Sequence, residues 1–196
     1  GGRLILWGCS RVAAPGSRAA QGRAAVDEFL ARNAAALGLR GDLGDLEVVE
    51  EKRGLGSTRV RYRQRLLGLP VHESDISVNQ SFDGQVWTVY SDYLSLSAGK
   101  ASPDIGSAAA EELARAAAGI AVLREPATSE LVWFKAGGGR AKLAWRMTLY
   151  ASEPLGDFLT LVDAGSGEIL LQENRIAFDT GHGMSYRPNP VQASGN

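Results

Sequence analysis

The chain has 196 residues, of which 44% are hydrophobic and 22% are charged, with 24 glycines and 7 prolines. This balance is typical of a globular protein and argues against a disordered or membrane protein. The net charge of −1 argues against general nucleic-acid binding, which needs a strong basic excess. No run approaches the ~20 apolar residues of a membrane span.

The N-terminal segment, residues 1–16, contains one short apolar run from Leu4 to Trp7. We expect a stub here, left by trimming of a longer precursor, and assign it no helix or strand. The stretch before Cys9 resembles the end of a lipoprotein signal, but its apolar run is shorter than the about 7 to 15 residues usual for such signals. Lipidation of Cys9 therefore stays open as an alternative.

A first helix is predicted from Ser17 to Leu37. Its apolar residues recur at helical spacing, and charged residues occupy the rest of the helical wheel. Gly38 then ends the helix, because glycine readily adopts the left-handed conformation of a helix C-terminus. The apolar positions are Val26, Phe29, Leu30, Ala34 and Leu37.

Four strand-like segments follow this helix, separated by glycine-containing turns that include the hairpin signal Asp83-Gly84. A second helix is predicted from Ser107, which would act as its N-cap. Four more strand-like segments follow that helix. The eight predicted strands are Leu46–Lys52, Thr58–Leu67, Val71–Gln80, Gln85–Leu94, Glu130–Ala136, Ala141–Tyr150, Phe158–Asp163 and Glu168–Ala177.

The order of these elements repeats, since each half has one helix followed by four strands, with an offset of about 85 residues. A helix packed on one face of an antiparallel sheet is the natural arrangement of each unit. The chain is therefore predicted to have five segments. These are a stub at 1–16, a first domain at 17–95, a linker at 96–106, a second domain at 107–178, and a tail at 179–196.

Charge is uneven along the chain, with 12 basic against 7 acidic residues up to position 65 and 9 against 15 after it. Strand periodicity places four of the basic residues on one face, namely Arg59, Arg61, Arg63 and Arg65. The plain interpretation is a solvated sheet face, and the alternative is a surface for an acidic partner. Gln64 falls on the opposite, apolar face, where it needs hydrogen-bond partners and thus has a defined polar role.

Catalytic and metal-binding motifs are incomplete. A zinc peptidase would carry HExxH, but His72-Glu73 lies on a predicted strand and has no second histidine at that spacing. A cysteine hydrolase would have to combine Cys9 with His72 or His182, which is a poor candidate. The glycines at 137–139 lack the Lys and Ser/Thr of a phosphate-binding loop. We therefore predict no catalytic residue, metal site or cofactor in this chain.

The first half carries a family resemblance. Arg61, Gln64, Gly68, Pro70 and Val71 resemble the signature of the fungalysin/thermolysin propeptide (FTP) domain. The second half is similar to a PepSY domain through its segments at 131–133, 143–145 and 162–170. The residues at 186–190, Tyr-Arg-Pro-Asn-Pro, are similar to segments that lie between propeptide and catalytic domain in fungalysin-like precursors.

The resemblance implies an α+β chain of two tandem cystatin-like domains, each one helix packed on a four-stranded antiparallel sheet. It implies the pro-region of a secreted zinc metallopeptidase precursor, which chaperones and inhibits the catalytic domain in cis. Zinc is then expected only in that domain. His182 is the tail candidate to approach that zinc, with an exposed loop histidine as the plainer alternative. The candidate interface residues are Arg59, Arg61, Arg63, Gln64, Gly68, Pro70 and Val71.

An alternative is kept open beside this one. The chain would then be a stand-alone FTP/PepSY-type binding module, or a lipoprotein, that inhibits or recruits proteases. A further alternative, an enzyme with an unrecognised active site, predicts a deep pocket with convergent titratable groups. An HExxH motif encoded downstream of Asn196 would favour the precursor, and a stop codon would favour the module.

Overall fold

The computed structural model describes the backbone of residues 4–11, and both backbone and side chains of residues 22–176. Among these residues there are three helices, α1 (Arg23–Arg32), α2 (Ala34–Leu37) and α3 (Ser107–Ala118). The strands are β1 (Leu4–Arg11), β2 (Leu46–Arg53), β3 (Ser57–Leu66), β4 (Leu69–Ser81), β5 (Gln85–Ser91), β6 (Ser97–Ala98), β7 (Val122–Leu123), β8 (Thr128–Lys135), β9 (Arg140–Glu153), β10 (Leu155–Asp163) and β11 (Ile169–Asn174).

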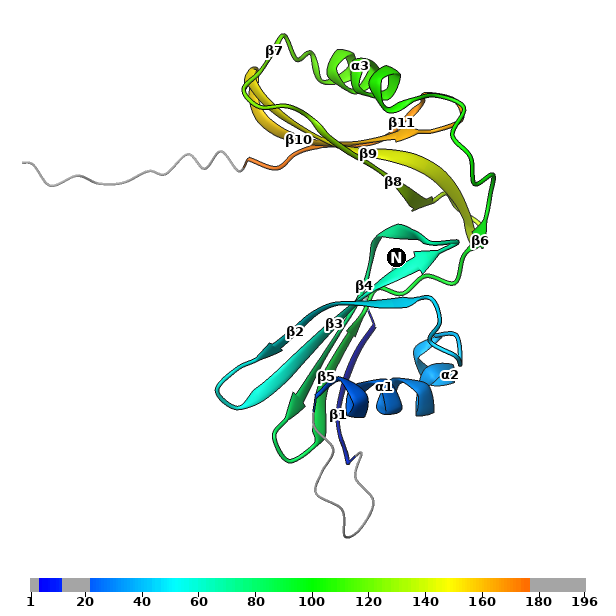
Figure 1. Cartoon of the computed structure of the whole chain (residues 1–196), viewed down its shortest axis with the longest axis vertical. Coiled ribbons are helices and arrows are strands. Elements are labelled where there is room, and N and C mark those ends of the chain that lie inside the picture. The colour runs from blue at the N-terminus through cyan, green and yellow to red at the C-terminus, as the bar shows by residue number, and fades with distance from the viewer. Residues whose placement is uncertain (1–3, 12–21, 177–196) are drawn as a thin grey trace, which may run out of the picture.

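The strands form a single mixed sheet of 11 strands, whose main path is β1-β5-β4-β8-β9-β10-β11. Strand β3 pairs with β4 and carries β2, while the short strands β6 and β7 both pair with β9. Figure 1 shows two lobes along this sheet. We call α1, α2 and β1–β5 the N-terminal lobe, and α3 and β6–β11 the C-terminal lobe. Strand β4 joins them, through a parallel pairing of Val71 with Trp133 of β8.

This sheet corrects the predicted fold class. Two cystatin-like domains, each a helix on its own four-stranded antiparallel sheet, are not what the chain forms, because the strands of both halves belong to one mixed sheet. The reason is the length of β4, which has 13 residues. Strand β5 pairs with β4 only from Ile76 onward, so the first residues of β4 extend past β5 and reach β8 (Figure 1).

Most of the longer elements lie where they were predicted, because their signals are local, but the single helix predicted up to Leu37 is divided at Asn33 into α1 and α2. Gly38 has φ of 69° and ends α2, and Gly84 has φ of 85° in the hairpin between β4 and β5. The N-cap was misplaced: α3 begins at Ser107 itself, and Gly106 is the N-cap residue without a side-chain cap. Strand β1, within the predicted stub, pairs antiparallel with β5 and extends the sheet.

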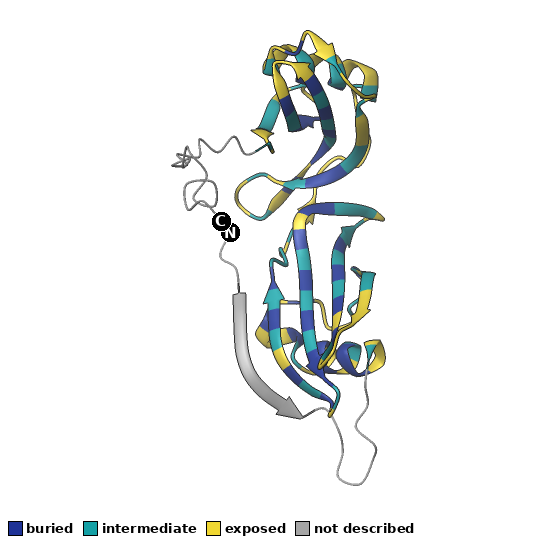
Figure 2. Ribbon diagram, turned by 90° about the vertical axis from the view of Figure 1, so that its left-hand side faces the viewer, coloured by how far each residue is buried: buried dark blue, intermediate teal, exposed yellow. Residues whose placement is uncertain are grey.

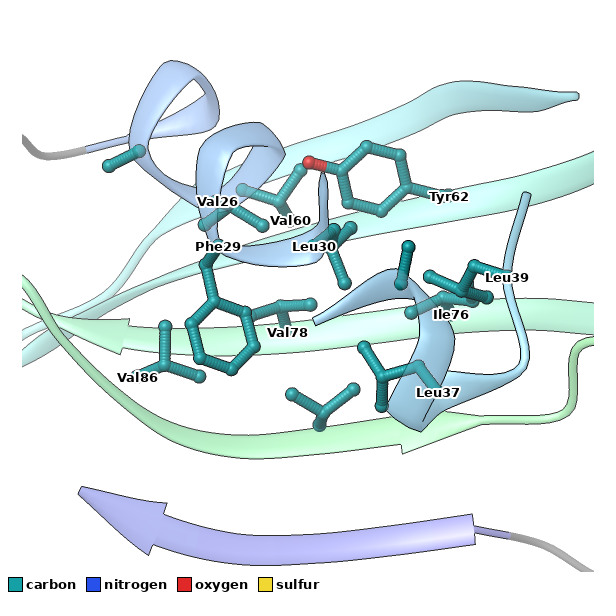
Figure 3. Close-up of a cluster of buried hydrophobic side chains, with 13 residues drawn as sticks. Val26, Phe29, Leu30, Leu37, Leu39, Val60, Tyr62, Ile76, Val78 and Val86 are labelled. Carbon is teal, nitrogen blue, oxygen red and sulfur yellow. The ribbon is translucent and has the colours of Figure 1, made fainter. Parts of the chain in front are cut away.

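Each lobe has its own buried cluster, and buried and exposed positions alternate along many strands (Figure 2). In the N-terminal lobe, Val26, Phe29 and Leu30 of α1 lie against Val60 and Val78 of the sheet (Figure 3). A third cluster lies between the lobes. Its buried members are Val71, Trp133, Ala141, Leu143 and Ala164.

Candidate functional site

The alternation predicted for β3 is confirmed by its burial. Val60, Tyr62 and Gln64 are buried, with exposed fractions of 0%, 2% and 3%. Their neighbours form what we call the arginine face, on the side of the sheet turned away from α1. Its members are Arg59, Arg61, Arg63 and Arg65, which are half-buried or exposed.

Three of these arginines contact carboxylates of neighbouring strands. Arg59 contacts Glu50 at 2.7 Å, and Arg65 contacts Glu47 at 2.7 Å. Arg63 lies 3.8 Å from Asp75. The hydrogen bond from Arg59 holds the pKa of Glu50 below its usual value. The arginine face therefore carries both charges, and three of its four guanidinium groups already lie within 4.0 Å of a carboxylate of the same chain.

Arg61 differs from the other three. Among the described residues it has no ion-pair partner within 4.0 Å, and its Nε is buried without a hydrogen-bond partner. Beside it lies a polar hollow of about 540 Å³ on the open face of the sheet. The hollow is lined by Arg59, Arg61, Asp75, Ser77, Asn79, Tyr90 and Asp92. A guanidinium in this setting can bind a carboxylate through two parallel hydrogen bonds.

Gln64, on the buried face, is fully hydrogen-bonded. Its Nε2 donates to the Leu94 carbonyl at 2.8 Å and to Asp45 at 3.4 Å. Its Oε1 accepts from the Leu94 N–H at 3.1 Å and from the Ser74 hydroxyl at 2.5 Å. The amide thus pairs with both backbone groups of Leu94, at the point where the chain leaves the N-terminal lobe. Gln64 was predicted to need hydrogen-bond partners, and the structure shows that its amide holds this exit.

The remaining motif residues form the hairpin between β3 and β4. Leu67 and Gly68 have φ of 48° and 81°, which is the left-handed pair that a tight two-residue hairpin turn requires. Arg65 Nη1 donates to the Gly68 carbonyl at 2.5 Å. Pro70 lies opposite Arg65, and Val71 pairs with the C-terminal lobe. The motif therefore shapes the tip that reaches the second lobe.

Trp133 of β8 fixes this tip in place. Its side chain has an exposed fraction of 0%, and its Nε1 donates to the Leu66 carbonyl at 2.7 Å. Two groups of predicted site residues are consequently kept apart. Arg59, Arg61 and Arg63 lie on the open sheet face, whereas Gln64, Gly68, Pro70 and Val71 lie toward the junction between the lobes.

A second hollow, of about 930 Å³, lies at this junction, and we call it the junction hollow. The sequence motifs placed His72 in an incomplete zinc motif and as a poor partner for Cys9, yet it lines this hollow and is 7% exposed. A histidine directly after the Pro-Val of the motif was the one signal available. The other lining residues are Glu73, Asp75, Asp92, Tyr93, Leu94, Ser95, Leu96, Phe134, Lys135 and Gly139.

Two predicted residues cannot be placed in the site. His182 lies outside the described residues, and Cys9 lies in β1, of which only the backbone is described. Within the described part of the chain, no cluster of three or more His, Cys, Asp or Glu residues is arranged to hold a metal ion. None of the helices described is long and apolar enough to cross a membrane.

Comparison with known proteins bears on residues 44–93, which match the Fungalysin/Thermolysin Propeptide Motif. The match spans β2 to β5 and includes the motif residues from Arg61 to Val71. The chain thus carries an FTP motif, as its sequence predicted, and this motif supports a metallopeptidase propeptide role in general. A comparison with curated proteins gave no match.

Among solved structures, the chain is similar to the Bacillus megaterium YpeB C-terminal domain. The identity is 13% and the TM-score is 0.40 over 79% of this chain, and the chain spans 66% of the length of that structure. A likeness at this level carries no argument about function.

Proposed function

We propose that this chain is the pro-region of a secreted zinc metallopeptidase precursor, where it chaperones and inhibits the catalytic domain. The observation that carries the proposal is the FTP motif at residues 44–93, which coincides with the antiparallel strands of the N-terminal lobe. In this proposal the FTP-like part covers residues 17–95, a PepSY-like part covers 107–178, and residues 179–196 lead toward the catalytic domain.

The chaperone role needs no chemistry from this chain. A folded pro-region that binds the native protease better than its unfolded chain stabilises the native state by binding linkage. It also accelerates folding if the same surface already binds the folding transition state. Inhibition needs only steric cover of the cleft. His182, or a backbone carbonyl of the tail, would add to it by occupying the open position on the catalytic zinc.

The arginine face is the surface proposed to dock on the protease. Its support is the position of Arg61, which is unpaired among the described residues and lies beside a polar hollow on a sheet face that α1 leaves open. An acidic side chain of the protease can reach this guanidinium without breaking an existing ion pair. Arg59 and Arg63 would then orient the approach electrostatically.

The test is to refold the catalytic domain encoded by the same gene with the added chain, and to measure active yield and inhibition. The double variant Arg61→Glu/Arg63→Glu should slow association by about tenfold or more at low ionic strength, because steering charges act mainly on the on-rate. The matched control is Arg32→Glu on α1, at the opposite face, which should associate normally. Unchanged yield and no inhibition with the unmodified chain would contradict the proposed function.

A further inference from the structure

His72 is a buried imidazole at the contact between the lobes. It follows Val71 in β4, and its ring centroid lies 6.1 Å from that of Phe134 in β8. Its side chain is 4% exposed. Both Nδ1 and Nε2 are buried, and neither has a hydrogen-bond partner among the described residues. Because a buried polar group without partners is costly, this ring is an energetic weak point of the junction.

Charged groups surround the ring at a distance. Glu73 on its own strand lies 3.8 Å from Nε2, which is too far for a hydrogen bond. Burial is the largest cause that lowers the pKa of His72, and Arg146 and Arg175 lower it further, while Glu73 and Glu173 raise it. The charged groups that face the ring or line the adjoining hollow are Glu73, Asp75, Asp92, Lys135, Arg146, Glu173 and Arg175.

The contacts that join the lobes lie next to this ring. Val71, its neighbour in sequence, makes the pairing of β4 with β8. Trp133, the residue before Phe134, donates its indole N–H to the Leu66 carbonyl. Glu73, the residue after His72, has φ of 51° and lies 4.0 Å from Arg175. A change that forces His72 outward therefore acts on every one of these contacts.

The imidazole nitrogens of His72 are closed off from solvent, although a solvent-accessible hollow lies beside the ring. The junction hollow opens beside the ring, while the nitrogen atoms themselves are buried. A protonated imidazole needs acceptors for two N–H groups. Among the described residues the closed junction supplies no acceptor within hydrogen-bond distance, and the Glu73 carboxylate, 3.8 Å from Nε2, can pair with only one of the two N–H groups. Hydration of the charged ring thus requires the tip of β4 to move away from β8.

We propose that the junction is an acid-sensitive hinge, in which protonation of His72 detaches the β4 tip from β8 while the cores of both lobes stay folded. This inference concerns the chain by itself and does not depend on the proposed function.

The direction of the pH effect follows from the linkage between proton binding by His72 and opening of the junction. In the open junction the pKa of His72 returns to about 6.5, and in the closed junction burial holds it lower. The open form therefore binds more protons, so the closed contact is fully stable above that pH and weakens below it. Between the two pKa values, the equilibrium constant for opening rises by about tenfold per pH unit.

Hydrogen exchange of the full chain tests this inference between about pH 7.5 and 5, after correction for the intrinsic exchange rate. We expect protection of the Trp133 indole N–H, which donates to the Leu66 carbonyl, to fall by about tenfold per pH unit below 6.5. Protection at buried residues of the lobe cores, such as Val78 and Leu149, should stay constant over the same range. A parallel loss of protection in the cores would overturn the inference, since it would indicate global unfolding.

Variants identify the titrating group. His72→Phe keeps a ring beside Phe134 but cannot be protonated, so its junction protection should be independent of pH. His72→Leu serves as a second apolar replacement. His182→Asn removes the other histidine of the chain and should keep the full pH response. A pH slope that persists in both His72 variants, or that is absent from the unmodified chain, would rule the hinge out.

Discussion

The two lobes bury their helices in different ways. In the N-terminal lobe the helix supplies large side chains to the core, and Val26, Phe29 and Leu30 of α1 are 0%, 8% and 0% exposed. In the C-terminal lobe the fully buried residues of α3 are Ala110 and Ala114 alone. Both lobes pack a helix on antiparallel strands, but the helix contributes large side chains to the core of one lobe and only alanines to the core of the other.

The large buried side chains of the C-terminal lobe come from the sheet. They include Met147 and Leu149 of β9, which are 1% and 0% exposed. Small helix residues let the backbone of α3 lie close over these side chains, whereas α1 must stand off by the length of its own side chains. The N-terminal lobe should thus be sensitive to losing helix volume, and the C-terminal lobe to gaining it.

Removing helix volume from the N-terminal lobe should have the largest effect. Leu30→Ala leaves a cavity between α1 and the sheet, and we expect it to lower the free energy of unfolding by about 2–5 kcal/mol. Chemical denaturation measures this change. The matched control is Leu113→Ala on α3, whose side chain is 41% exposed. Equal losses for the two variants would contradict the contrast between the lobes.

Adding volume to α3 is the complementary change. Ala110→Leu forces a larger side chain against the sheet, where Ala110 is 0% exposed, and should cost about 1–3 kcal/mol. Ala109→Leu, one position earlier on the exposed side of the helix, should leave the midpoint of denaturation nearly unchanged. If Ala110→Leu were tolerated as well as Ala109→Leu, α3 would not be held close to the sheet.

At Leu94, where the chain leaves the N-terminal lobe, the backbone is held by hydrogen bonds to Gln64 and not by apolar packing against a helix. Gln64→Leu would leave the Leu94 backbone groups and the Ser74 hydroxyl without this partner, at a cost of about 1–3 kcal/mol. Ser74→Ala removes only one of these bonds and should cost less. Hydrogen exchange at Leu94 should rise in the Gln64 variant and much less in the Ser74 variant. Equal exchange in both would show that Gln64 does not hold the exit.

The smallest expected effect is an increase in the free energy of unfolding. Leu67 has φ of 48° and is 69% exposed at the turn that enters β4. Leu67→Asn should stabilise the chain by about 1 kcal/mol, because asparagine tolerates the left-handed conformation better than leucine. Leu55→Asn, at the exposed tip of the β2–β3 hairpin, lacks that backbone conformation and is the control. A thermal scan that shifts equally for both variants would refute the turn explanation.

Local features of the fold could be predicted from the sequence. The alternation of β3 separated Arg59 and Arg61 from Val60 and Tyr62, and glycines marked the turns, because both signals act over a few residues. The buried amide of Gln64 was also predicted to need partners, although nothing in the sequence indicated Leu94.

The joining of the lobes could not be predicted in this way. The pairing of Val71 with Trp133 links residues far apart in the chain, and neither strand carries a local signal for the other. His72 was missed for the same reason, since its burial depends on Phe134 of the second lobe. Sequence periodicity indicates which face of a strand is buried, but not which distant element covers it.

The strand pairing between β4 and β8 has a mechanical consequence. The register between them consists of one residue pair, whereas β3 pairs with β4 over most of its length. A force that pulls the chain apart from its ends would therefore load this residue pair and the Trp133–Leu66 hydrogen bond early, before the longer ladders inside each lobe. In a force-extension experiment, the first rupture should lengthen the chain by less than the unravelling of either lobe.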